Sequence, residues 1–355
     1  MKIGIITFEF NYNYGAILQA TALLDYLRGI GHSPLIINRG WKDDDEGGGN
    51  LIGKVVGRLW SNKLIIDFKN RHWDMTVPVK DQSSLNSTLS NMDAIITGSD
   101  QIWNSACIEN MGLYYFGIDA LPRQKLIAYA PSFGKNRFET NKYQIDTLKT
   151  HFRKFKAISV REDDGVSIMQ NVFGIDNVMK VLDPTMLMDK DYYLRLAGIT
   201  DLKQKDSLAY YILDNDPQKQ RWIDTLSRNL GLKPVNINKP EYNGSLPIGK
   251  IRSLRYPSIE NWLKNIAESK FVLTDSFHGT VFSIIFNRSF LTFGNNARGN
   301  SRFESLLSMF ELQSRIIVNP DEITLPVKEI NYPKVNILLN KYRKESADFL
   351  LMALS

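Results

Sequence analysis

The sequence predicts an α/β fold built from two similar domains. A chain of 355 residues is too long for one ordinary core, and it suggests two domains of about 150 to 180 residues each. Hydrophobic residues at 43% and charged residues at 23% are typical of a folded globular protein. Short apolar runs alternate with stretches of helical spacing in both halves, and this alternation indicates parallel sheets covered by helices.

The first half begins with a strand, a helix and a second strand, at Lys2 to Phe8, Gly15 to Arg28 and Pro34 to Asn38. A strand, helix, strand order of this kind indicates two parallel strands. Further strands are expected at four apolar runs: Ala94 to Thr97, Leu126 to Tyr129, Ala157 to Val160 and Val178 to Leu182. The acidic, glycine-rich stretch from Asp43 to Asn50 predicts a mobile surface loop.

The same pattern starts again after Asp183, so we place a boundary near residue 186, with an N-terminal domain over 1–186 and a C-terminal domain over 187–355. Strands are expected at Leu208 to Leu213, Pro234 to Ile237, Phe271 to Thr274 and Phe290 to Phe293. Helices are expected at Pro217 to Leu230, Ser258 to Ser269 and Thr280 to Asn287. A last helix, Val335 to Leu350, is expected to pack back on the N-terminal domain.

Composition and charge argue against several classes of protein and of partner. The single cysteine, Cys107, excludes an internal disulfide framework and fits the cytoplasm. The first residues are typical of a strand and not of a signal peptide, and no run of about 18 apolar residues predicts a membrane span. The net charge of +6 comes from dispersed basic residues, which argues against nucleic acid as a partner. In Leu51 to Lys69, helical spacing favours a core-facing helix, with peripheral contact to an anionic membrane surface as the alternative.

His278 is the first candidate for chemistry. Among four histidines, it is the one that follows a buried strand directly, in the segment Asp275 to Gly279 that we expect to form a turn before a helix starting at Thr280. A helix N-terminus disfavours the imidazolium, so we expect His278 to be neutral near pH 7 and able to accept a proton. The alternative is a capping or packing histidine.

Three more polar loops follow predicted strands, at Glu9 to Gly15, Gly98 to Asn104 and Arg161 to Asp163. Ligands of open parallel sheets collect at this end of the strands. Arg161 offers a fork for a carboxylate or a phosphate; its alternative is an ion pair with Glu162, Asp163 or Asp164. Gly15 either supplies backbone donors or simply lets the chain turn tightly.

No segment of the sequence matches a dinucleotide fingerprint, a Walker motif, a metal-ligand spacing or a serine-hydrolase elbow. The chemistry that remains is acid–base catalysis, with arginines binding anions.

Six segments, in order, make the chain resemble the polysaccharide pyruvyl transferase family over about residues 3–310. They are Asn13 to Ala20, Gly98 to Asn104, Ala128 to Gly134, Ile158 to Glu162, Val181 to Thr185 and Asp275 to Gly279. The resemblance implies two Rossmann-like domains in a GT-B-like arrangement with an interdomain cleft. It also implies transfer of a pyruvyl group from phosphoenolpyruvate to two hydroxyls of a sugar, which leaves a cyclic ketal and free phosphate without a further cofactor.

The resemblance further implies residue roles. His278 is expected to transfer protons and Arg161 to bind an anion, while the donor is expected to contact Gly15, Ser99, Asp100, Gln101, Ser276 and Gly279. The family places a basic residue about twenty positions beyond the histidine; Arg298 matches by spacing, and Arg302 lies close to it. The expected acceptor is a cell-surface polysaccharide of the capsule or exopolysaccharide type, or its lipid-linked precursor. A GT-B glycosyltransferase using a nucleotide sugar and a non-catalytic glycan-binding protein are the alternatives.

Overall fold

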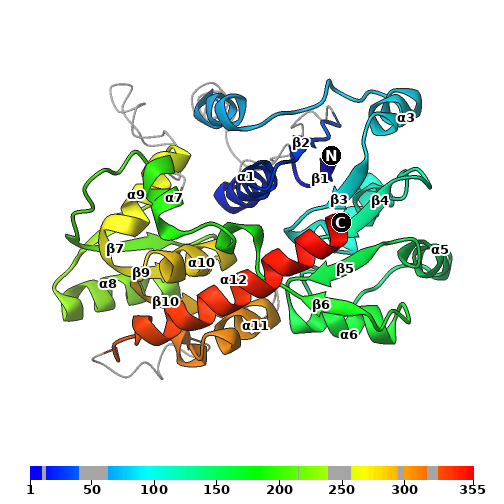
Figure 1. Cartoon of the computed structure of the whole chain (residues 1–355). Coiled ribbons are helices and arrows are strands. Elements are labelled where there is room, and N and C mark those ends of the chain that lie inside the picture. Colours follow the sequence, from blue (N-terminus) through cyan, green and yellow to red (C-terminus); the bar gives the residue numbers. More distant parts are fainter. Residues whose placement is uncertain (10–12, 40–62, 215, 239–256, 295–299, 318–326) are drawn as a thin grey trace, which may run out of the picture.

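Two parallel β-sheets form the frame of the molecule, one in each half of the chain (Figure 1). The structure is a computed structural model, and it describes residues 1–9, 13–39, 63–214, 216–238, 257–294, 300–317 and 327–355. The first sheet has six strands in the order β2-β1-β3-β4-β5-β6, and the second has five in the order β11-β10-β9-β7-β8. Neighbouring strands pair in parallel throughout both sheets. We refer to the parts built on these sheets as the first and second domains.

The strands lie where the apolar runs predict them, within a few residues, except for the two-residue β11, which was not predicted. The first sheet consists of β1 (Lys2–Ile6), β2 (Ser33–Ile36), β3 (Ala94–Thr97), β4 (Lys125–Ala128), β5 (Ala157–Val160) and β6 (Val178–Lys180). The second consists of β7 (Lys205–Tyr211), β8 (Lys233–Asn236), β9 (Ser269–Thr274), β10 (Ser289–Phe293) and β11 (Ile316–Ile317). The chain therefore passes from one sheet to the other between Lys180 and Lys205. The boundary near residue 186 lies in this stretch and stays a prediction.

Helices and short 3-10 turns connect the strands. The helices are α1 (Tyr14–Gly29), α3 (Gln82–Ser90), α4 (Ala106–Met111), α5 (Lys142–Phe152), α6 (Asp163–Asn171), α7 (Lys190–Leu196), α8 (Pro217–Leu230), α9 (Ile259–Glu268), α10 (Phe277–Ile285), α11 (Ser301–Met309) and α12 (Tyr332–Leu354). The 3-10 turns are η1 (Gln101–Trp103), η2 (Tyr114–Phe116), η3 (Pro184–Met186) and η5 (Gln313–Arg315). None of the helices in these described ranges has the length and apolar character needed to cross a membrane.

Local chemistry fixes the ends of these helices. Helix α8 has the predicted bounds because Asp216 caps its first turn, Pro217 opens it and Gly231 ends it in a left-handed conformation with φ of 63°. The loop predicted at Asp43 to Asn50 lies outside the described residues. Of the predicted helix from Leu51 to Lys69, only the last part is described; residues 63–72 are helical, and Ile65 and Phe68 are buried, which agrees with a core-facing helix.

The predicted turn before α10 is too long. Only Asp275 and Ser276 separate β9 from α10, and the helix begins at Phe277 and not at Thr280. Ser276 is the N-cap: its side chain accepts from the backbone N–H of Gly279, while the Oγ1 of Thr274 accepts from the N–H of Ser276. These two bonds start the helix early. His278 therefore lies in the first turn of α10.

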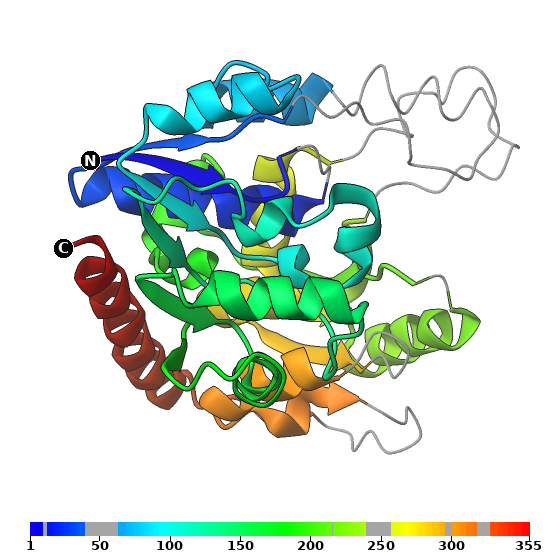
Figure 2. The same ribbon diagram turned by 90° about the vertical axis from the view of Figure 1, so that its right-hand side faces the viewer.

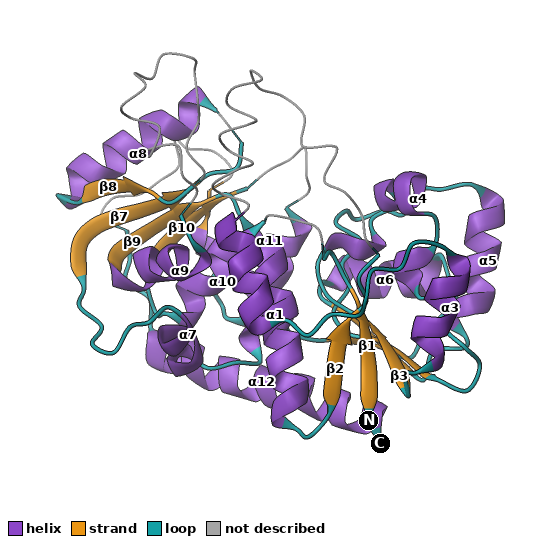
Figure 3. Ribbon diagram, turned by 90° about the horizontal axis from the view of Figure 1, so that it is seen from above, coloured by secondary structure: helices purple, strands orange, loops and turns teal. Residues whose placement is uncertain are grey.

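Helix α1 lies between the two domains and packs against both (Figures 1 and 3). The ring of Tyr14, its first residue, stacks on Trp262 of α9 with centroids 5.4 Å apart, and its hydroxyl donates to the carbonyl of Pro257 at 2.7 Å. One continuous apolar core contains side chains from β1, α1, α9, α10 and α12. The domains are thus in direct contact here, and the interdomain cleft stays a prediction.

Helix α12 crosses the molecule from the second domain to the first (Figures 1 and 2). Near its start, the hydroxyl of Tyr332 donates to the carbonyl of Ser283 on α10. Further along, the hydroxyl of Ser346 accepts from the N–H of Leu182 at 2.9 Å, and Phe349 packs against Tyr129, which follows β4. The contacts of α12 therefore reach both domains, and the two chain ends lie at the same end of the first sheet (Figures 1 and 3).

Candidate active site

His278 lies against helix α1 of the other domain. A Cβ atom built on Gly15 would come within 2.0 Å of Nδ1 of His278, so a residue with any side chain at position 15 would displace the imidazole ring. The suggestion that Gly15 allows a tight turn is wrong, because Gly15 is the second residue of α1 and has no positive φ. This glycine is required by the close approach of two domains at the candidate acid–base group.

Asp183 connects the parts of the candidate active site. Its Oδ2 accepts from Nη1 of Arg161 at 2.8 Å and from the hydroxyl of Ser99 at 3.0 Å, and it lies 3.5 Å from Nε2 of His278. Its Oδ1 accepts from both the backbone N–H and the hydroxyl of Thr185. The Asp183 side chain is fully buried. It thus brings residues that follow β3 and β5 together with a residue of α10.

The charge of Asp183 is favoured by its neighbours. Burial raises the pKa of this carboxyl, but His278 and Arg161 outweigh burial and hold the pKa well below its ordinary value. Asp183 is therefore an anion at any physiological pH. The expectation that His278 is neutral near pH 7 stays a prediction.

Arg161 is surrounded by acidic side chains but only one edge of it is hydrogen-bonded. Besides the bond to Asp183, its Nη2 lies 3.9 Å from Asp100 and its Nε lies 3.8 Å from Glu162, and neither nitrogen has a hydrogen-bond acceptor among the residues that the structure describes. The guanidinium stacks on the ring of Phe277, 4.1 Å from the centroid. Burial lowers the pKa of Arg161, but Asp183, Glu162 and Asp100 raise it further than burial lowers it.

Arg161 forms its closest ion pair with Asp183 and not with one of the three partners expected for it. Glu162 lies at 3.8 Å, whereas Asp163, another expected partner, instead pairs with Lys180 at 2.7 Å. The pair with Asp183 at 2.8 Å is the closest. Asp183 was missed as a site residue, although it follows β6 at the same end of the sheet at which Arg161 follows β5. That shared position was the signal for finding it.

The residues expected around the donor lie close to this cluster. Ser99 bonds to Asp183, and Asp100 lies beside Arg161 with an unusual positive φ of 73°. The side chain of Gln101 packs so tightly on Gly134 that a Cβ there would come within 2.4 Å of its Oε1. The Gly98 and Ala128 segments of the resemblance are therefore packed against each other at the carboxyl ends of β3 and β4.

In the second domain, the expected donor residues shape the start of α10. Ser276 caps the helix, and Gly279 leaves room for Thr274, whose Oγ1 would lie 2.3 Å from a Cβ at that position. Arg302 is a buried residue of α11 whose charge acts on Glu162. Burial raises the pKa of Glu162, and Arg161 and Arg302 oppose that rise without cancelling it. Arg298 lies outside the described residues.

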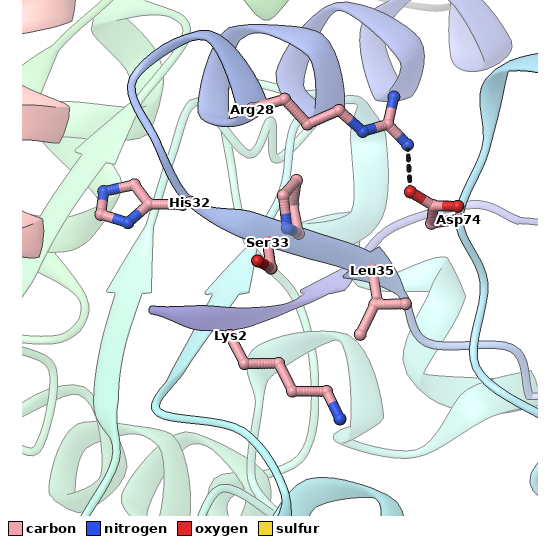
Figure 4. Close-up of a pocket in the computed structure, with 7 residues that line it drawn as sticks. Lys2, Arg28, His32, Ser33, Leu35 and Asp74 are labelled. Carbon is pink, nitrogen blue, oxygen red and sulfur yellow. Dashed lines mark hydrogen bonds and ion pairs between the residues drawn. The ribbon is translucent and has the colours of Figure 1, made fainter.

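A separate pocket lies at the opposite end of the first sheet. It has a volume of about 410 Å³ and is lined by residues that include Lys2, Arg28, His32 and Asp74 (Figure 4). These residues lie near the amino ends of β1 and β2 and the end of α1, and Arg28 and Asp74 form an ion pair across it at 2.9 Å. Ligands of parallel sheets bind at the carboxyl ends of the strands, so we do not assign the chemistry to this pocket.

The family follows from a comparison with family models. A model described as polysaccharide pyruvyl transferase matches residues 13–297, which contain His278, Arg161 and Asp183. The chain belongs to this family. The two parallel sheets and the helices that connect their strands confirm the predicted fold class, α/β with two Rossmann-like domains in a GT-B-like arrangement. No curated protein matches the sequence.

Several solved structures are similar in fold to this pyruvyl transferase family member. An uncharacterized protein of Klebsiella pneumoniae is 13% identical, with a TM-score of 0.50 over 90% of this chain and 93% of its own. An α-glucosyltransferase solved with UDP is 12% identical, with a TM-score of 0.48 over 99% and 95% of the two chains. MnaA of S. aureus, also solved with UDP, is 11% identical, with a TM-score of 0.47 over 98% and 90%. At such identities the likeness concerns the fold alone.

Proposed function

We propose that this protein transfers a pyruvyl group from phosphoenolpyruvate to two hydroxyls of a sugar, forming a cyclic ketal and releasing phosphate. The observation that carries the proposal is the meeting of His278, from the second domain, with Arg161 and Asp183, from the first, in a member of the pyruvyl transferase family. An acid–base group beside a guanidinium suits a donor that carries a carboxylate and a phosphate.

Arg161 is suited to bind one anionic group of the donor. Asp183 holds Nη1, which fixes the plane of the guanidinium and leaves Nε and Nη2 without acceptors. Buried donors without acceptors destabilise a fold, and such groups are found at binding sites, where a ligand completes their hydrogen bonds. We therefore assign these two nitrogens to a carboxylate or phosphate oxygen of phosphoenolpyruvate, with Arg298 and Arg302 as candidates for the second anion.

Proton transfer in this reaction has a simple balance. The two sugar hydroxyls lose two protons as their oxygens bond to C2 of the donor; one proton goes to the methylene carbon, which becomes a methyl group, and the other leaves with the phosphate. We assign to His278 the transfer of a proton between a hydroxyl and that carbon. Asp183, 3.5 Å from Nε2, stabilises the imidazolium that exists between these two steps.

Mass spectrometry tests the reaction directly. The protein is incubated with phosphoenolpyruvate and candidate glycans, and the expected product is a glycan carrying the added mass of a pyruvate ketal, together with an equal amount of phosphate. We expect His278→Gln to lower turnover by about 10²-fold to 10⁴-fold and Arg161→Ala to remove it, with unchanged circular dichroism. His32→Gln, at the far end of the first sheet, is the control and should keep full activity.

Two kinds of result would contradict the proposal. Near-normal turnover in His278→Gln or Arg161→Ala would refute the role of that residue. Thermal shifts measured with phosphoenolpyruvate and with common nucleotide sugars separate the proposal from its nearest alternative. A shift with a nucleotide sugar, and none with phosphoenolpyruvate, would favour a glycosyltransferase.

The proposed function also includes the acceptor glycan and the place in the cell where the reaction occurs. We infer that the acceptor is a sugar unit of a cell-surface polysaccharide or of its lipid-linked precursor. An enzyme acting on such a precursor works at the cytoplasmic face of the membrane. The dispersed positive charge of the chain, +6 in total, is compatible with that place.

A further inference from the structure

A second polar cluster lies in the first domain, beyond the end of β1. It consists of Glu9, which follows β1 by three residues, and of Tyr114 and Tyr115 in η2. The three residues are 5%, 4% and 1% exposed. In each of them, one oxygen has no hydrogen-bond partner within the described part of the chain: Oε2 of Glu9 and the hydroxyls of both tyrosines. Three buried oxygens without partners in one place need an explanation other than stability.

The surroundings of Glu9 hold its carboxyl in place while leaving Oε2 without a partner. Its Oε1 accepts from the N–H of Arg39 at 3.0 Å, and its backbone carbonyl accepts from Nζ of Lys69 at 2.6 Å. Burial raises the pKa of Glu9 to about 7, so that at neutral pH this carboxyl is present both as an acceptor and as a donor. A carboxyl group that can both donate and accept hydrogen bonds suits a ligand group that also does both.

The cluster is connected to the active site through η1. Asp100, just before η1, lies beside Arg161, and Trp103, at its end, donates from its indole N–H to the carbonyl of Tyr115 at 3.2 Å. On the β1 side, the hydroxyl of Thr7 donates to the carbonyl of Ser99 at 3.3 Å. Glu9 and the two tyrosines therefore lie at the same end of the sheet as Arg161, on the other side of η1.

We propose that Glu9, Tyr114 and Tyr115 bind hydroxyl groups of the acceptor sugar. The inference rests on the proposed function, because it gives the second substrate a place beside the donor. A neutral sugar hydroxyl both donates and accepts, which matches a carboxyl and two phenol groups. An anionic donor is disfavoured next to Glu9, and aromatic rings such as that of Tyr115, packed edge-on to Phe8, suit the apolar face of a sugar.

Like the donor site, this cluster is closed to solvent in the structure. The unpartnered oxygens are covered in this structure, and so are Nε2 of His278 and Nη2 of Arg161. Both groups thus become available to ligands only through a movement of the residues that cover them. Donor and acceptor then bind on the two sides of η1, with the reacting hydroxyls toward His278.

Conservative substitutions test the proposal through two measurements. Binding of the acceptor glycan should weaken, while thermal stability should not fall. Tyr114→Phe and Tyr115→Phe remove only a hydroxyl that has no partner in the protein, and Glu9→Gln keeps the acceptor for the N–H of Arg39. We expect the KM for the acceptor glycan to rise about fivefold to tenfold per variant, with the KM for phosphoenolpyruvate unchanged and the Tm unchanged or higher. Tyr192→Phe is the matched control: its hydroxyl donates to Asp25 at 2.6 Å, near the end of α1 that lies away from Gly15, so its Tm should fall with both KM values unchanged.

Each other result decides against the inference. An acceptor KM that stays constant in both Tyr→Phe variants, even with a raised Tm, would mean that the cluster binds water only. A parallel rise of both KM values would mean that the whole active site has been disturbed. If the wild-type protein transfers no pyruvyl group to any glycan, the proposed function fails. Saturation-transfer NMR with methyl galactoside, methyl glucoside and methyl mannoside, which needs no turnover, then still tests whether the wild type binds a sugar that Tyr114→Phe does not.

Discussion

Asp183 and Glu9 are two buried carboxyl groups at the same end of one sheet, and their surroundings differ. Asp183 accepts hydrogen bonds on both oxygens from Arg161, Ser99 and Thr185, and its pKa lies well below the ordinary value. Glu9 accepts on one oxygen only, and its pKa rises to about 7. Burial raises the pKa in both; the number of donors and cations decides the outcome. Asp183 uses both oxygens to hold neighbouring residues in place, whereas Glu9 keeps one oxygen that a ligand can bind.

The largest effect is expected from removing the carboxylate that has the most partners. Asp183→Ala leaves the guanidinium of Arg161 buried without its closest anion, so we expect the free energy of unfolding to fall by about 3 to 5 kcal/mol. Denaturant unfolding followed by circular dichroism measures this. Asp67→Ala is the control, because its ion pair with Lys63 is exposed and is worth about 1 kcal/mol at most. Equal losses in the two variants would show that Asp183 does not hold Arg161.

The second prediction concerns the dependence of stability on pH. The unfolded Glu9 ionises near its ordinary pKa of 4.5 and the folded one near 7, so the free energy of unfolding should fall as the pH rises between these values. The difference between the two pKa values corresponds to about 3 kcal/mol. Asp183 gives no slope in this range, because it is ionised in both states.

Glu9→Gln isolates this contribution. Unfolding is measured between about pH 4.5 and pH 8 for the variant and the wild type, and the variant should lose the part of the slope that belongs to Glu9. It should also be the more stable protein at the upper end of the range. A wild-type slope that persists in the variant would mean that the pKa of Glu9 is not raised.

The smallest effect is expected at the glycine beside His278. Gly15→Ala forces a Cβ against the imidazole, so we expect a loss of about 1 to 3 kcal/mol in stability and a larger relative loss of turnover, since His278 moves away from Asp183. Gly29→Ala is the matched control on the same helix: a Cβ there meets nothing within 4 Å, and stability should rise by up to about 1 kcal/mol. Unfolding and turnover are measured on both variants. Unchanged turnover in Gly15→Ala would show that the close approach does not position His278.

The sequence was sufficient for the architecture and for part of the site. Apolar runs such as Ala94–Thr97 and Ala157–Val160 predict strands because a strand buried on both faces needs only apolar side chains over a short length, and both runs have the predicted bounds. His278 and Arg161 could be chosen from their places after strands. The structure brings them to the same carboxylate.

What could not be predicted depends on contacts between distant segments. Nothing near Gly15 in the sequence indicates that His278 packs on it. The place of Asp183 after a strand indicates which end of the sheet it lies at, but not that it accepts from both Ser99 and Arg161. The early start of α10 depends on a single side chain, that of Ser276, and strand and helix ends are set by such individual bonds. The unpartnered oxygens of the Glu9 cluster can be recognised only when every neighbour is known.

Helix α12 has a consequence for how the chain reaches its final form during synthesis. Residues of the first domain, such as Leu182 and Tyr129, obtain partners from Ser346 and Phe349, which are made more than 150 residues later. At the translation rates of about 5 to 20 residues per second that are typical of cells, the first domain therefore waits for many seconds with these positions uncovered. A chaperone that binds apolar surface has that interval in which to act, and a ribosome stalled before residue 346 presents a first domain that is not yet complete.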